Sequence, residues 1–489
     1  MDNFLDNYVN SLYARENMVA DQTQQNLFSK KEYYELLKPV MDIISKNKDM
    51  DLDELRNLIY VNSGFENSLR EFVEKKEMVP GLVFSYGTNN YKETLVIGNR
   101  QEVTLDNNGN IVPSVEKMTE DTIFDLASVT KLYTSLSILK LVQENIINLD
   151  DEVVKYAPEF KNLKGVKILD LLSFQVPLVT NGRVDRAASK EEAEKILFDI
   201  SVDKESKNLR PYTDMGAMVL KYVIEHASGM NYYNYVEDNI LKPLGMTDTH
   251  VVVPKTKIDR VASTNIDGMY YKDGNFRINT SNPKGIVYDP KAKIMGSPSG
   301  DLTGHSGLFS TANDMTKLAK GIMYGRVIDD KYVEEMAKNR TGRKVMDDGV
   351  EKNIQYLGYL CYSKNPVLAD SEIYHAMSGR TLASAGWTGN QLTVDPLNEI
   401  FLYMSGNRSH NRMTFIDQAQ KDKVVTDEYG KKTIILPNGQ EMIDATRFAW
   451  DRDKLIHQAL RLAIQYKMLE DFYSMYKEEI KQEEKVRNI

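Results

Sequence analysis

The sequence predicts an α+β protein in which antiparallel strands flank a mostly helical stretch. Two adjacent strands are expected near residues 79–103, in VPGLVFSYGTN and ETLVIGNRQEV, which are separated by a short polar connection. From about 145 to 290 the apolar residues recur with helical spacing, and strand patterns are few. Strand patterns return after about residue 300 and end with WTGNQLTVDP and NEIFLYMSGN.

Composition narrows the class of protein. The chain has 489 residues, 42% of them hydrophobic and 27% charged, which is typical of an ordinary globular protein. Its formal net charge of −9 gives no electrostatic reason to expect nucleic acid. Cys361 is the only cysteine, so no intramolecular disulfide forms. The N-terminus lacks the pattern of a signal peptide and no run of 18 apolar residues occurs, so we expect a cytoplasmic protein without a membrane partner.

Residues 1–64 are expected to form a helical N-terminal extension to a main unit of 65–489. Apolar residues at Tyr34, Leu37, Met41 and Ile44 follow helical spacing, with Ser29 as a candidate cap. The extension carries no catalytic pattern. We expect it to pack against the main domain or a partner chain, which leaves a homo-oligomer open.

The stretch from Asp121 to Glu144 carries the clearest chemical pattern. Small and polar residues give way at Ser128 to a run with helical spacing, and Lys131 lies just under one helical turn after Ser128, on the same face. A serine nucleophile needs a nearby base, and a lysine can serve if burial lowers its pKa. The helix N-terminus would help to stabilise an oxyanion. The S-x-x-K spacing recurs elsewhere in the chain, so its surroundings must distinguish Ser128.

These surroundings, FDLASVTK followed by LDDEVVKYAPEF, resemble the nucleophile region of the serine β-lactamase and penicillin-binding-protein superfamily. The likeness is to the class C β-lactamase-like branch of esterases, D,D-carboxypeptidases and D-aminopeptidases, and it covers roughly residues 65–407 plus the final helix. It implies an antiparallel sheet with helices on both faces, a mostly α-helical lobe at about 145–290, and a site at their junction. It also implies a small acyl substrate and no cofactor or metal.

A second motif, Tyr212-Thr213-Asp214, resembles the Y-x-N element of the family. The resemblance implies that Tyr212, favoured as a phenolate beside Lys131, takes the Ser128 proton and returns it to the leaving group. Asp214 would anchor Lys131 or a substrate amide. GIVYDPKAKIMG and GHSGLFSTANDM also resemble this branch; within the latter, His305 is either a site-shaping residue or a structural histidine.

The third motif departs from the family pattern. Ser384-Ala385-Gly386 stands where the family has K-T-G or H-T-G, and Trp387 follows. By resemblance these three residues line the substrate, and the backbone N–H groups of Ser128 and Trp387 form the oxyanion hole. The missing cation favours an ester or another uncharged acyl substrate. Arg380 or His375, just upstream, are alternative sources of the charge.

Residues of about 411–446 are expected to be an insertion before a final helix that begins near Phe448. Within it, KKTIILPNGQEM predicts a hairpin with an Asn-Gly turn. The insertion would serve as a lid or an oligomer contact, or be surface decoration.

Three functions follow as hypotheses. The first is a cofactor-free serine hydrolase that works through an acyl-enzyme on a small ester or amide. The second is a penicillin-binding D,D-carboxypeptidase or D-aminopeptidase. The third is a non-catalytic binding or assembly module on the same fold. The sequence contains no H-E-x-x-H, clustered Cys/His pattern, P-loop or G-x-S-x-G elbow, which argues against metal, nucleotide and α/β-hydrolase chemistry.

Overall fold

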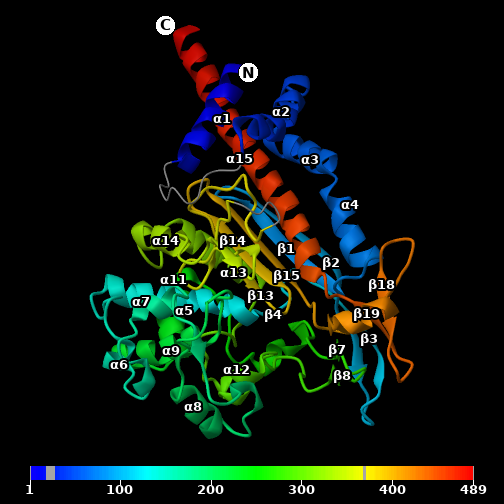
Figure 1. The fold of residues 1–489 in the computed structure, drawn as a ribbon. Helices are drawn as coiled ribbons and strands as arrows, with labels where there is room; N and C mark the ends of the chain where they lie inside the picture. The colour runs from blue at the N-terminus through cyan, green and yellow to red at the C-terminus, as the bar shows by residue number, and fades with distance from the viewer. Residues whose placement is uncertain (1, 18–27, 367–370, 488–489) are drawn as a thin grey trace.

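A seven-stranded sheet lies between two layers of helices in the computed structural model, which describes residues 2–17, 28–366 and 371–487 (Figure 1). Every neighbouring pair of strands in this sheet is antiparallel. The expected α+β class is therefore confirmed. In spatial order the strands are β12 (Tyr362–Ser363), β13 (Leu382–Gly386), β14 (Asn390–Asp395), β15 (Ile400–Gly406), β1 (Gly81–Thr88), β2 (Lys92–Leu105) and β3 (Ile111–Lys117).

The two faces of the sheet contribute to two separate hydrophobic cores. Successive side chains of a strand point to opposite faces, so Val83 and Tyr403 belong to one core while Phe84 and Leu402 belong to the other. The first core is covered by α5 (Thr130–Gln143) and α13 (Ala312–Met323). The second is covered by the long C-terminal helix α15 (Phe448–Arg487), which begins at the expected residue (Figure 1).

The N-terminal helices pack into the same core as α15. Both α2 and α3 begin with a capping box, formed by Ser29 with Glu32 and by Asp51 with Glu54. A buried ion pair of 2.7 Å between Arg56 and Glu470 joins α3 to α15. These helices therefore extend the second core, which they share with α15, and do not form a separate core. They are α1 (Asp2–Asn17), α2 (Lys30–Lys46), α3 (Leu52–Ser63) and α4 (Phe65–Arg70).

A second group of helices lies on the α5 side of the sheet. Among them α9 packs against α5 in a continuous apolar core. The members are α6 (Val153–Tyr156), α7 (Ile168–Leu172), α8 (Lys190–Phe198), α9 (Met215–Ser228), α10 (Tyr232–Val236), α11 (Lys242–Leu244), α12 (Pro290–Ile294) and α14 (Asp330–Ala337). The range of about 145–290, expected to be mostly helical, also contains strands: residues 267–279 form a β-hairpin that the sequence pattern did not indicate, and 178–179 pair with 201–202.

That hairpin belongs to a six-stranded second sheet built largely from residues 412–444. The expected hairpin with the Asn438-Gly439 turn is present as β18 and β19, with Gly439 at a φ of +83°. Strand β16 runs parallel to β7 and joins the two parts. In spatial order the strands are β17 (Val425–Thr426), β18 (Lys432–Ile435), β19 (Glu441–Asp444), β16 (Arg412–Ile416), β7 (Asp267–Tyr270) and β8 (Phe276–Asn279).

Three short strand pairs complete the described structure. They are β4 (Phe124–Asp125) with β9 (Phe309–Ser310), β5 (Leu178–Val179) with β6 (Ser201–Val202), and β10 (Lys344–Asp347) with β11 (Val350–Asn353). The first pair matters for function, because β4 leads directly to Ser128 and β9 leads from the His305 loop into α13, whose N-terminus is capped by Thr311.

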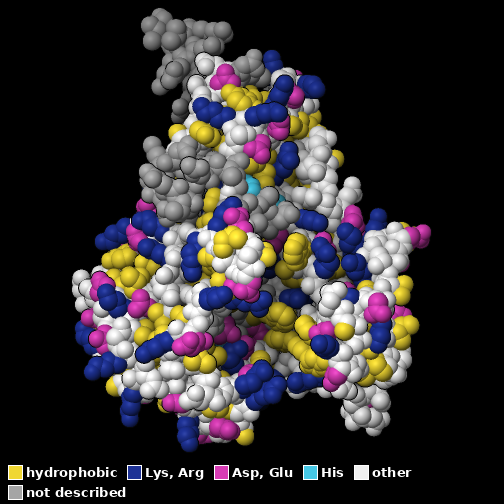
Figure 2. Space-filling model, in the orientation of Figure 1, with side chains coloured by type: hydrophobic (Ala, Val, Ile, Leu, Met, Phe, Trp, Pro, Cys, Tyr) yellow, Lys and Arg dark blue, Asp and Glu magenta, His cyan; other side chains and the backbone are white. Residues whose placement is uncertain are grey.

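The face of the molecule in Figure 2 carries basic and acidic side chains in close mixture. Lys and Arg are interspersed with Asp and Glu over this face, so their fields partly cancel within the Debye length of about 8 Å at physiological salt. Among the described residues, no helix combines the length and the apolar character needed to cross a bilayer.

Candidate active site

Ser128 lies in a 3₁₀ turn, Ala127–Val129, that leads directly into α5. The backbone of Ala127 has a φ of +45°, which turns the chain sharply just before the serine. Lys131, one helical turn later, is fully buried, and its Nζ donates a hydrogen bond of 2.9 Å to Ser128 Oγ. The expected loop-to-helix transition and the approach of lysine to serine are both present.

The nucleophile loop is held by Asp125. Its carboxylate accepts hydrogen bonds from the backbone N–H groups of Ala127 (2.9 Å) and Tyr288 (2.6 Å). Its carbonyl oxygen accepts from Thr388 Oγ1 and Asn390 Nδ2, which come from the end of β13 and the start of β14. Burial raises the pKa of Asp125 to about 6, because these two N–H donors only partly compensate for lost solvation.

This raised pKa predicts a pH-dependent stability difference between the protein and its Asp125→Asn variant. The folded carboxyl binds its proton more tightly than the unfolded one, so its ionisation opposes folding as the pH rises. Between about pH 4 and pH 7 the parent should lose about 2 kcal/mol of unfolding free energy relative to the variant. Urea denaturation of both proteins at each pH measures this double difference. A difference that stays constant with pH would contradict the prediction.

Tyr212 and Asp214 reach Lys131 from the segment that precedes α9. Asp214 Oδ1 lies 2.7 Å from Lys131 Nζ, and Tyr212 places its ring centroid 4.9 Å from the same nitrogen. The Tyr212 ring is stacked between Phe174, at 5.3 Å, and Tyr362, at 5.9 Å. The second motif therefore meets the first, and aromatic stacking fixes the orientation of the tyrosine.

A buried lysine can serve as a base only if burial lowers its pKa, and Lys131 does not meet that condition. Burial acts to lower its pKa, but the adjacent Asp214 carboxylate outweighs that effect and the net shift is upward. Burial likewise acts to raise the pKa of Asp214, while Lys131 above all holds it well below its usual range. The two residues form an ion pair with Lys131 as the ammonium ion.

Three further residues extend this ion pair into a half-buried network at the wall of the cavity. Lys291 Nζ lies 3.0 Å from Asp214 and 3.2 Å from Asp289, and Asp289 accepts a hydrogen bond of 3.0 Å from His305 Nε2. Asp289 also caps α12 through the N–H of Ala292. Sequence reasoning proposed His305 but missed Asp289 and Lys291, although both lie in the segment GIVYDPKAKIMG that it singled out.

The network also places three metal-ligating side chains together. Ligand atoms of Asp214, Asp289 and His305 lie within 4.8 Å of one another. Lys131 and Lys291 form ion pairs with these two carboxylates. The negative charge of Asp214 and Asp289 is therefore balanced by the two lysines and needs no metal ion.

Strand β13 carries the third motif against the nucleophile loop. A Cβ at Gly386 would stand 2.4 Å from the carbonyl oxygen of Leu126, so only glycine fits there. Trp387, directly after β13, is 44% exposed and lines the same cavity as Ser128. The guanidinium of Arg408, a residue that sequence reasoning missed, stacks 4.3 Å from the Trp387 ring.

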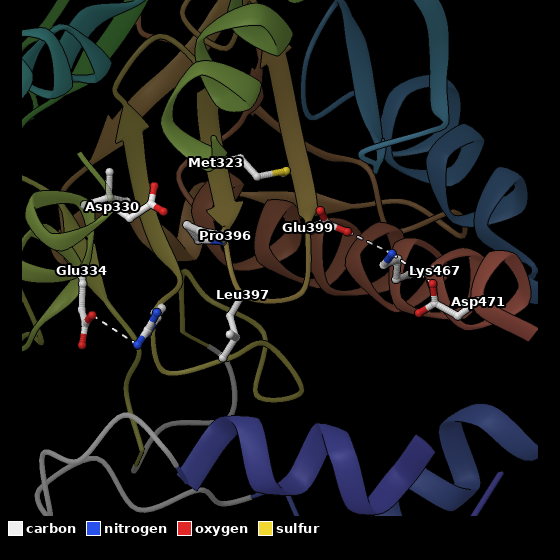
Figure 3. A pocket seen from close by; sticks show the side chains of 10 residues that line it. Met323, Asp330, Glu334, Pro396, Leu397, Glu399, Lys467 and Asp471 are labelled. Atoms are coloured by element: carbon white, nitrogen blue, oxygen red, sulfur yellow. Dashed lines mark hydrogen bonds and ion pairs between the residues drawn. The ribbon is translucent and has the colours of Figure 1, made fainter. Parts of the chain in front are cut away.

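The other residues of the third motif do not line this cavity. Ser384 and Ala385 are on β13 but are not among the cavity-lining residues, and neither is Gly386. Arg380 pairs with Glu334 at 3.2 Å in a separate cavity near α13, α14 and α15. Figure 3 shows this cavity, which Asp330 and Lys467 also line. His375 lies outside the Ser128 cavity, in the electrostatic range of Glu32 in α2. Neither residue restores a positive charge beside the serine.

A cavity of about 620 Å³ joins these groups at the junction of the main sheet, the helices and the second sheet. Ser128, Tyr212, Asp214, Asp289 and Trp387 all line it. This volume falls in the range of small-molecule sites.

Comparison with known proteins identifies the family and the fold of this chain. Residues 71–426 match the family model described as beta-lactamase. A putative D-alanyl-D-alanine carboxypeptidase of Salmonella gallinarum (strain 287/91 / NCTC 13346) is 30% identical over 329 residues, which cover 60% of this chain and 71% of that protein. Homologous proteins with the same name and similar statistics occur in other Salmonella strains, among them Salmonella enteritidis PT4.

Solved structures share the fold at low sequence identity. EstCE1, a hydrolase with promiscuous acyltransferase activity, aligns with a TM-score of 0.54 at 15% identity, covering 80% of this chain and 97% of that one. A variant of simvastatin synthase from Aspergillus terreus aligns with a TM-score of 0.52 at 14% identity, covering 82% and 96%. With the family match over most of its length and a relative at 30% identity, this chain belongs to the β-lactamase family, whose members are serine hydrolases.

Proposed function

We propose that this protein is a cofactor-free serine hydrolase that forms an acyl-enzyme at Ser128 with a small ester or amide. The observation that carries the proposal is the 2.9 Å hydrogen bond between Lys131 Nζ and Ser128 Oγ, within a cavity large enough for a small molecule. A lysine that served only to stabilise the fold would need no more than its carboxylate partner, whereas Lys131 also contacts a serine that opens into a cavity. This contact therefore favours catalysis over a non-catalytic scaffold.

In the proposed mechanism the Tyr212 oxygen accepts the proton from Ser128 Oγ while Ser128 Oγ attacks the substrate carbonyl. Lys131, held as an ammonium ion by Asp214, lies beside the Tyr212 ring, where its positive charge assists this proton transfer, and it orients Ser128 Oγ by a hydrogen bond of 2.9 Å. The backbone N–H groups of Ser128 and Trp387 would hold the oxyanion. Tyr212 then protonates the leaving group, and water attacks the acyl-enzyme to release the acid and restore Ser128.

A D,D-carboxypeptidase or D-aminopeptidase is the second candidate. It is favoured by the relatives named as putative D-alanyl-D-alanine carboxypeptidases, which are 30% identical to this chain. It is disfavoured by β13, which offers Ser384 where the family pattern has a cation. The two candidates differ in whether a penicillin acylates Ser128.

Intact mass spectrometry after exposure to a fluorophosphonate, and in parallel to a penicillin, tests these proposals. We expect one fluorophosphonate adduct on the parent protein and none on Ser128→Ala. A penicillin adduct at the same serine would favour the peptidase, and its absence the esterase. If neither probe labels the folded parent protein, the hydrolase proposal fails and a binding or assembly module becomes the better account.

A further inference from the structure

One wall of the Ser128 cavity is a face of the β7–β8 hairpin. Asp267, Met269 and Tyr271 from the first half and Arg277 and Asn279 from the second half all line the cavity. Each is two residues from the next along its half, as the alternation of a strand requires. Cross-strand register places Met269 opposite Arg277 and Asp267 opposite Asn279. The hairpin therefore presents one continuous face to the site.

The opposite face of the hairpin is anchored by the segment 412–444. Tyr270, Phe276 and Ile278 pack in an apolar cluster with Met413, Ile434 and Met442. The space above Gly268 is filled by Met413, whose sulfur would stand 2.2 Å from a Cβ at that position. The segment expected to be a lid, an oligomer contact or a surface decoration thus supports a wall of the cavity.

Most charged side chains that line the cavity already have an ion-pair or a hydrogen-bond partner. Lys131 and Lys291 neutralise Asp214 and Asp289, and Arg183 pairs with Asp185 at 2.6 Å. Lys293 donates to the carbonyl oxygen of Ser281 and to Asn282. Asp267 is buried and accepts a hydrogen bond of 2.8 Å from Tyr288.

Two cationic side chains of the cavity have neither an ion-pair nor a side-chain hydrogen-bond partner among the described residues. Arg186, at the end of the 3₁₀ turn Val184–Arg186, and Arg277, on β8, are both exposed, and neither forms an ion pair with any residue that the structure describes. Two guanidinium groups at one cavity offer planar donor pairs suited to a carboxylate or a similar anion. Neither arginine lies on β13, the strand that carries the third motif.

We infer that Arg277 and Arg186 recognise an anionic group, such as a carboxylate, on the substrate whose carbonyl is attacked by Ser128. The inference rests on the proposed hydrolase function. It moves the recognition of a negatively charged substrate group away from β13, where Ser384 and Ala385 carry no positive charge. The recognition site becomes the β7–β8 wall together with the turn Val184–Arg186. The second sheet thereby becomes a determinant of substrate specificity.

The test compares esters that differ only in charge. One pair places the charge in the acyl group, as mono-para-nitrophenyl glutarate against para-nitrophenyl valerate. The other places it in the leaving group, as meta-carboxyphenyl butyrate against phenyl butyrate. The ratio of kcat/KM for the anionic over the neutral ester is measured for the parent, Arg277→Gln, Arg186→Gln and the double variant. Lys272→Gln, which removes a charge from the hairpin turn outside the cavity, is the control.

We expect the double variant to lower this ratio about tenfold or more in one of the two pairs, as the loss of charge-assisted hydrogen bonds would. Each single variant should lower it less, and the control should preserve it. Ratios in the double variant equal to those of the parent in both pairs would overturn the inference while leaving the hydrolase proposal intact. Absence of any Ser128-dependent hydrolysis of all four esters would overturn both.

Discussion

Replacing Lys131 by methionine is expected to reduce ester turnover by at least about 10³-fold, in line with the loss of a residue that acts as a unit with its nucleophile. The side chain is fully buried and contacts Ser128 Oγ at 2.9 Å and Asp214 Oδ1 at 2.7 Å. Methionine has a similar length but no charge. Because the variant leaves Asp214 without its closest cation, the free energy of unfolding should also fall by about 3 kcal/mol.

A second variant separates the two effects of this substitution. In Lys131→Met with Asp214→Asn, the unpaired carboxylate is removed together with the ammonium group. Stability measured by urea denaturation should recover at least partly, while turnover should stay low. Loss of a residue that activates the nucleophile leaves far less than a tenth of the parent rate. If Lys131→Met retained more than about a tenth of that rate, Lys131 would have no part in activating Ser128.

Tyr212→Phe is expected to lower kcat by about 10² to 10⁴-fold, the range for loss of a general acid–base group. The hydroxyl is the group proposed to carry the proton. Phenylalanine keeps the ring that stacks on Phe174 and Tyr362, so the unfolding free energy should change by less than about 1 kcal/mol. Steady-state kinetics on one neutral ester, with denaturation curves in parallel, measures both quantities.

Tyr362→Phe is the matched control for this prediction. Tyr362 stacks on the other face of the Tyr212 ring at an interplanar angle of 9°, so the variant removes a hydroxyl from the same stack. Its turnover should remain within about threefold of the parent. This decrease is far smaller than the one caused by losing an acid–base group. Equal losses in the two variants would show that removing any hydroxyl from this stack lowers turnover, and that the Tyr212 hydroxyl has no special part in the reaction.

Helix starts, helix caps and tight turns, which are set by residues adjacent in the sequence, were predictable from the sequence. The turn into α5 at Ser128, the cap of α2 at Ser29, the hairpin at Asn438-Gly439 and the start of α15 at Phe448 all follow local patterns. Their signals lie within a few residues, because caps and tight turns are satisfied by short-range hydrogen bonds and by backbone dihedral angles. The order of the three motifs also predicted the fold, through resemblance to a family.

Interactions between distant segments were decided only by the tertiary structure. The sequence by itself determined that Ser128 and Lys131 share a helical face, and through resemblance it brought Tyr212 and Asp214 to the same site. It did not determine the charge of Lys131, because the sign of that pKa shift depends on whether burial or the Asp214 carboxylate dominates. The pairing of β7 with β16 across more than a hundred residues likewise has no local signal, since each strand is stabilised by partners that only the fold supplies.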